Sequence, residues 1–214
     1  RPEGKAAPAP ARTLEPFALG RVVLNQDTKG RDTPFIRNRD KFIKAMAGQP
    51  DDAGRLAALK ANGLDDCVAA KRTDLLASIE KIKSELACDP QRTRPGCGVS
   101  FRFIAQLLRN TTPDEVFIQV AIAAALIRAE PQVVALNLVQ SEDNLIARRD
   151  YTRHMQIVAF LTKEVKVSLH AGELWLGFVP PPDLTFHIRQ AIEQGHGQRA
   201  PLHHEFAAHL QGSL

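Results

Sequence analysis

The residues best suited to chemistry form one short run, Ser168-Leu169-His170-Ala171-Gly172-Glu173-Leu174. The run begins within an apolar segment, Val165 to His170, that we predict to be a strand. An imidazole at a strand's carboxyl end can bind a metal ion, and a carboxylate three residues later can move a proton between a metal-bound water and a substrate. The small Ala171-Gly172 step permits the tight turn that such a pair needs. The same spacing is also typical of a packed histidine followed by a polar loop, so spacing alone leaves both interpretations open.

Strands and helices alternate in the second half of the chain. This alternation is typical of a parallel sheet covered by helices, with right-handed crossovers. Periodicity does not distinguish part of a TIM barrel from a doubly wound sheet. The predicted strands are Val99–Ile104, Gln132–Val139 and Val165–His170, and the predicted helices run from Thr112 to Ala129, Asp150 to Lys163 and Leu184 to Glu193.

The first half is predicted to be mainly helical, after a short strand at Arg21–Leu24. Apolar residues at helical spacing and the breaks at Gly48-Gln49-Pro50 and Gly63 divide a helical subdomain, Thr33 to Ala87, into three helices. The domains that follow from this pattern are a flexible tail (1–16), a mainly helical segment with a cysteine loop (17–97), three β/α units (98–199) and a divergent tail (200–214).

Cys88 and Cys97 flank a turn-rich loop with two prolines and a glycine, so their side chains can meet. We expect a disulfide, which implies an oxidising compartment; two free thiols in a cytosolic protein are the alternative. The spacing does not fit a Cys-x-x-Cys metal or redox motif.

The bulk composition excludes several classes of protein. The net charge is +4 over 214 residues, with basic residues interspersed among acidic ones, which gives no nucleic-acid-binding stripe. One Trp and one Tyr leave little for stacking single-stranded bases. No apolar stretch approaches the roughly eighteen residues of a membrane span, and no signal peptide is visible.

Several separate motifs resemble the adenosine deaminase family, in the family's order. The run around His170 resembles the family's fifth-strand motif, and the similarity extends over roughly residues 88–199. The cysteine loop and the helices before it resemble the long insert of bacterial, exported members. The other matching segments are Phe101–Arg109, Val134–Val139 with Ser141-Glu142-Asp143, Arg149-Asp150-Tyr151, Phe178–Pro181, and Phe186–Arg189 with Ala191–Glu193.

The resemblance implies a partial TIM (β/α) barrel, with an inserted or preceding helical subdomain, that hydrolyses adenosine to inosine and ammonia. It implies one zinc ion with His170 as a ligand, and Glu173 as the acid that protonates the purine ring. Glu142, Asp143 and Gly172 become candidates on the substrate side, and the substrate is a purine nucleoside. A periplasmic or secreted location follows from the likeness to exported members, with a cytoplasmic location as the alternative.

Other parts of the family pattern are missing. No His-x-His pair occurs, and no histidine precedes His154. After Gln198-Arg199 the chain continues Ala200-Pro201-Leu202-His203-His204 where the family has its catalytic histidine, and the family's paired aspartates are absent. Gly195-His196-Gly197 aligns with an earlier, non-catalytic element. The chain is therefore expected to be an incomplete deaminase, or else a catalytically inactive remnant with a binding or structural role.

The remaining histidines are given structural roles. His154 and His187 lie on predicted helices and are expected to be surface or packing residues. His204 and His209 are five residues apart, which does not suit a metal site on a helix.

Overall fold

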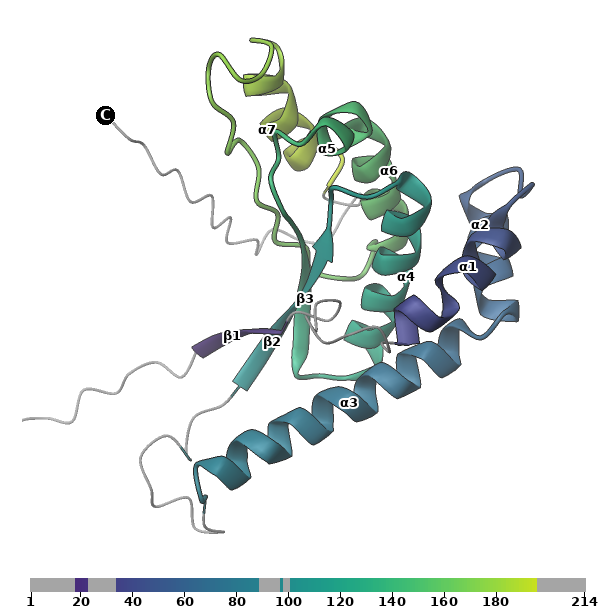
Figure 1. Cartoon of the computed structure of the whole chain (residues 1–214), viewed down its shortest axis with the longest axis vertical. Helices are drawn as coiled ribbons and strands as arrows, with labels where there is room; N and C mark the ends of the chain where they lie inside the picture. The colour runs from purple at the N-terminus through teal and green to yellow at the C-terminus, as the bar shows by residue number, and fades with distance from the viewer. Residues whose placement is uncertain (1–17, 23–33, 89–96, 98–100, 196–214) are drawn as a thin grey trace, which may run out of the picture.

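The computed structural model describes residues 18–22, 34–88, 97 and 101–195 (Figure 1). The predicted tails at 1–16 and 200–214, most of the cysteine loop, and His196, His203, His204 and His209 lie outside these residues. The described elements are β1 (Ala18–Val22), α1 (Pro34–Met46), α2 (Asp52–Ala61), α3 (Leu64–Glu85), β2 (Phe101–Leu108), α4 (Pro113–Ala129), β3 (Val133–Val139), α5 (Leu145–Arg149), α6 (Tyr151–Leu161) and α7 (Asp183–Glu193).

The sheet is parallel and its strands follow chain order, β1-β2-β3. β2 lies in the middle, and its register with β3 shifts between Phe103 and Ile104. Because the strands are parallel, the ends of β2 and β3 and the chain after them meet at one edge of the sheet. That carboxyl edge is where the candidate residues lie.

The prediction of a partial TIM barrel is wrong. Helices hold most of the residues that the structure describes, and the sheet there has three strands and does not close. The predicted strand Val165–His170 joins β3 through a single bridge, Leu136 with Val167. Beyond that bridge, the side chain of Asn137 accepts the backbone N–H of His170, so a regular ladder does not continue. A barrel requires every strand edge to be paired, whereas alternation of strands and helices specifies only local crossovers.

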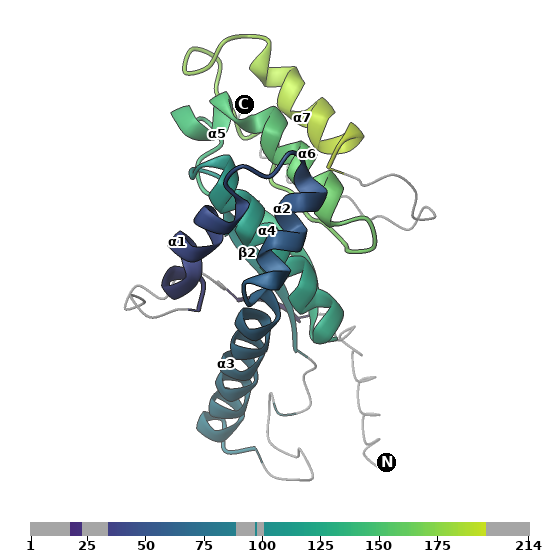
Figure 2. The same cartoon turned by 90° about the vertical axis from the view of Figure 1, so that its right-hand side faces the viewer.

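Helix α4 forms the centre of the structure. It packs against β2 and β3 on one side and against α1, α3 and α6 on others (Figure 1). Every position from Val116 to Ala124 is buried, and eight of these nine residues are apolar, so the buried surface extends around the whole circumference of the helix. A helix that is apolar all round is stable only when it is covered on all sides. This explains why α1 and α3 pack against α4 as an outer layer. Helix α3 projects below the rest of the described elements in Figure 2.

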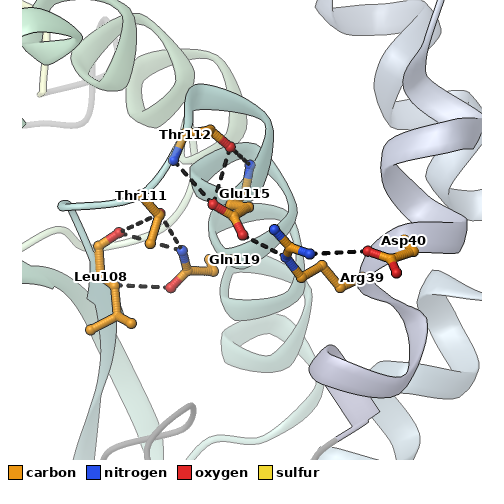
Figure 3. Close-up of polar contacts among 7 residues, drawn as sticks. All are labelled: Arg39, Asp40, Leu108, Thr111, Thr112, Glu115 and Gln119. Carbon is orange, nitrogen blue, oxygen red and sulfur yellow. Dashed lines mark hydrogen bonds and ion pairs between the residues drawn. The ribbon is translucent and has the colours of Figure 1, made fainter. Parts of the chain in front are cut away.

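The first turn of α4 is fixed by side chains (Figure 3). The hydroxyl of Thr112 accepts the N–H of Glu115, and the Glu115 carboxylate accepts the N–H of Thr112 at 3.1 Å, which is a capping box. One turn later the Gln119 Oε1 accepts the N–H of Leu108 at 2.8 Å, and its Nε2 donates to the Leu108 carbonyl at 3.4 Å. Gln119 thus satisfies the last residue of β2 and ties the strand's carboxyl end to α4.

Ion pairs join the outer helices to the α/β part of the chain. Arg39 pairs with Glu115 (Figure 3), and two further pairs, Arg55 with Asp114 and Arg153 with Asp52, connect α2 to α4 and α6. These pairs link residues far apart in sequence, so they fix how the helical layer sits on α4.

Cys88 and Cys97 form a disulfide with a Cα–Cα distance of 5.5 Å. The remaining cysteine, Cys67, is a buried free thiol in α3. In the part of the chain that the structure describes, no helix is both long and apolar enough to cross a membrane.

Candidate functional site

His170 is held by Asn137, a buried residue of β3. The Asn137 Oδ1 accepts the backbone N–H of His170 at 3.2 Å, and its Nδ2 lies 2.7 Å from the His170 Nδ1. Because Oδ1 already serves the backbone N–H, the amide nitrogen faces the ring and donates to Nδ1. In this contact Nδ1 is the acceptor, so the ring hydrogen is on Nε2.

Glu173 follows through a turn that requires glycine at 172. Gly172 has φ +83°, and a Cβ built there would lie 2.6 Å from the Ile188 Cδ1 of α7. The Glu173 backbone N–H donates to the Glu142 Oε2 at 2.9 Å, while the Glu173 side chain is exposed. The backbone of the turn is therefore fixed, and the carboxyl is accessible to a substrate or to solvent.

Glu142, expected to face a substrate, instead lies inside the protein. Its side chain is 1% exposed. Besides the N–H of Glu173, it meets the His187 Nδ1 at 3.0 Å and the Arg109 guanidinium at 3.7 Å. Asp143 is exposed and accepts a hydrogen bond from the Ser141 hydroxyl. Of the two acidic residues in this loop, the first supports the site and the second lies on the surface.

Arg109 is the main residue that sequence reasoning missed. It follows β2 directly, and its side chain is 3% exposed. The Nη2 atom donates to the carbonyl of Leu138 at 2.7 Å and to the carbonyl of His170 at 2.6 Å. Burial lowers the pKa of Arg109, and the neighbouring Glu142 carboxylate opposes that shift. A charged residue directly after an apolar strand was the available signal.

His187 of α7 is buried, so of the two roles expected for it, surface or packing, it has the packing role. Its ring stacks on that of Tyr151, with centroids 3.7 Å apart and planes inclined by 7°. The Tyr151 hydroxyl donates to the His187 carbonyl at 2.9 Å, and burial raises the pKa of that hydroxyl. The stack attaches α7, and with it Ile188 beneath Gly172, to α6.

The described residues do not by themselves fit a zinc ion. No group of three His, Cys, Asp or Glu side chains among them is arranged to hold a metal, and catalytic zinc sites use three protein ligands. Zinc at the Nε2 of His170 would also require the hydrogen to move to Nδ1, and Asn137 now presents a donor to that atom. His170 is one candidate ligand, and the described residues do not complete a set of three around it.

Comparison with known proteins gives no relative: no family model, no curated protein and no solved structure matches the chain.

Proposed function

We propose that the chain is a segment of a zinc-dependent hydrolase of the adenosine deaminase type, with His170 as one metal ligand and Glu173 as the acid. Its substrate is a purine nucleoside carrying a ring amino group.

One observation carries the proposal: His170 and Glu173 lie on a single turn whose backbone is fixed from both ends. His170 donates its N–H to Asn137, and Glu173 donates its N–H to Glu142. A catalytic pair needs this kind of preorganisation, because a displacement of about 1 Å costs about a hundredfold in rate.

The role proposed for Glu173 is proton transfer to the purine ring. When the oxygen of a water molecule attacks the carbon that bears the amino group, negative charge develops on the adjacent ring nitrogen; the amino group then leaves as ammonia. A carboxyl that donates a proton to that nitrogen in the transition state removes the cost of this charge. The side chain of Glu173 is exposed, which leaves its carboxyl accessible from solvent.

The metal part of the proposal depends on ligands in addition to His170, since one imidazole does not hold a catalytic zinc ion. No step is therefore assigned to the metal. The Cys88–Cys97 disulfide supports an oxidising compartment for the protein.

The test is inosine formation from adenosine by the intact protein in the presence of zinc. Glu173→Gln removes the transferable proton, and the expected loss in rate is about a hundredfold to ten-thousandfold. Glu193→Gln, an exposed glutamate at the end of α7, is the matched control and is expected to leave the rate unchanged. Equal rates in both variants would reject Glu173 as the acid.

A second candidate is a deaminase-like protein that binds a purine nucleoside without chemistry. The observation that favours it is the single candidate zinc ligand among the residues described. Calorimetric binding of adenosine by a protein that forms no inosine would support this candidate over the hydrolase.

A further inference from the structure

Both ends of the 170–173 turn are held by one buried ion pair. Arg109 comes from the end of β2, and Glu142 comes from the loop after β3. Their facing atoms, Nη1 and Oε1, lie 3.7 Å apart, and the two side chains are 3% and 1% exposed. The pair lies at the carboxyl edge of the sheet, where β2, β3 and the segment at 166–168 end.

Each partner holds a different end of the turn. Through Nη2, Arg109 donates to the carbonyl of Leu138 in β3 and to the carbonyl of His170. It therefore spans the gap between two neighbouring segments of the sheet. The second carboxylate oxygen of Glu142 accepts the N–H of Glu173.

The burial of Arg109 and Glu142 has to be offset by the contacts that they make. Burying two charges costs several kcal/mol per ion unless hydrogen bonds satisfy the remaining donors and acceptors. Here those bonds go to the carbonyls of Leu138 and His170 and to the N–H of Glu173, and His187 lies 3.0 Å from the Glu142 Oε1. The Arg109 Nε has no hydrogen-bond partner among the described residues.

We propose that Arg109 and Glu142 are positioning residues that hold the backbone of His170 and Glu173 as one unit. The role in substrate handling rests on the proposed function, whereas the clamping of the turn can be measured without it. Neither residue is expected to touch the substrate, because both side chains are buried.

The experiment compares Glu142→Gln with Glu130→Gln in the full chain. Glu130 is a matched control: it is a buried carboxylate that pairs with Arg72 and accepts the N–H of Gln132 at 3.2 Å, at the other end of β3. A carboxamide has one acceptor oxygen and no charge, so the side chain at position 142 cannot present an oxygen to both Glu173 and Arg109. Amide hydrogen exchange is measured by NMR, and adenosine binding by calorimetry.

The expected result is exchange at the Glu173 amide that is at least about tenfold faster in Glu142→Gln and unchanged in Glu130→Gln. The affinity for adenosine is expected to fall about tenfold in Glu142→Gln and to stay unchanged in Glu130→Gln. If Glu142→Gln does not fold, Arg109→Lys serves in its place, because a single ammonium on a flexible stem does not reproduce the fixed guanidinium fork. Hydrogen exchange is then measured at the His170 amide, with the same expected increase.

Unchanged exchange at Glu173 in Glu142→Gln overturns the clamp. Faster exchange with unchanged adenosine affinity overturns the positioning role and leaves a purely structural pair. Faster exchange in a protein whose wild type does not bind adenosine retains the clamp and rejects the proposed function, so the two failures are distinguishable.

Discussion

At the scale of single residues, Asn137 controls what His170 can do. Its amide serves the backbone N–H and the ring of the same histidine, so the orientation of one determines the other. In this arrangement the Nε2 atom carries a hydrogen, so it has no lone pair with which to bind a metal ion.

Asn137→Asp is expected to strengthen zinc binding. A carboxylate can accept both the backbone N–H and a hydrogen on Nδ1, which frees the Nε2 lone pair for the metal. Changes of this kind next to a ligating histidine alter metal affinity by about tenfold to a hundredfold. Competition titration with a chelator measures the change. Equal zinc affinity in the two proteins would mean that Asn137 does not determine the ring tautomer.

The sequence predicted the candidate pair but not its support. His170 and Glu173 could be found because their types, spacing and position after an apolar segment point to chemistry. The place of Arg109 directly after an apolar strand was a signal that it matters, but the sequence does not show what Arg109 or Glu142 contacts. Their contacts join residues 31 to 61 positions apart. Such contacts follow from packing of the sheet and helices, which local patterns do not contain.

At the scale of elements, α4, α6 and α7 lie where apolar spacing predicted helices. Helix α4 begins at Pro113, one residue after the predicted start at Thr112. The short helix α5 was missed, because five residues are too few to show a period. The strand predicted at Val165–His170 was wrong in extent: the apolar alternation was present, but one bridge formed and side-chain bonds replaced the rest.

The capping box of α4 gives a prediction about stability. Thr112→Ala removes the hydroxyl that accepts the Glu115 N–H, and is expected to lower the free energy of unfolding by about 1 kcal/mol. Thr73→Ala is the control: Thr73 is exposed within α3, where alanine is the better helix former, so the change should be slightly stabilising. Urea denaturation measures both. A Thr112→Ala protein as stable as the control would contradict the role of the cap.

His154 in α6 predicts a dependence of stability on pH. The side chain is 1% exposed, its Nε2 has no hydrogen-bond partner among the described residues, and burial lowers its pKa from 6.5 to about 4. Because the folded pKa lies below the unfolded one, the stabilisation is complete above pH 6.5 and is lost as the pH falls toward 4. The loss approaches about 1.4 kcal/mol per pH unit in that window.

Denaturation of the wild type and of His154→Leu at several pH values tests this dependence. The variant is expected to lose less unfolding free energy than the wild type between pH 6.5 and pH 4. Parallel pH profiles would show that His154 is not the group that titrates.

At the scale of the whole molecule, an outer helical layer and a small parallel sheet share one helix, α4, as their common core. The free thiol of Cys67 is buried in α3, within the helical layer, and the Cys88–Cys97 disulfide comes after α3 in the chain. Cys67 is 2% exposed, and burial raises its pKa to about 11.

Thiol labelling therefore has a defined outcome. The native protein at neutral pH is expected to react at none of its three cysteines, the denatured protein at Cys67 alone, and the denatured, reduced protein at all three. Reduction of the disulfide is expected to lower the free energy of unfolding by about 2–3 kcal/mol. Rapid labelling of two cysteines in the unreduced, denatured protein would be inconsistent with one disulfide and one free thiol.

The fold class shows the limit of local patterns at this scale. Each strand–helix–strand step fits a right-handed parallel crossover, and these steps are common to closed and open sheets. Closure depends on how many strands pair and on what lies at the edges, which in the described residues are β1 and the single-bridge segment after α6.

The most direct measurement of the central claim is the zinc content and inosine formation of the same preparation of the intact protein, alongside His170→Ala. The account predicts about one zinc ion per chain with inosine formed from adenosine, and loss of both in His170→Ala. A wild type that contains no zinc and forms no inosine, or a variant that retains both, would contradict it.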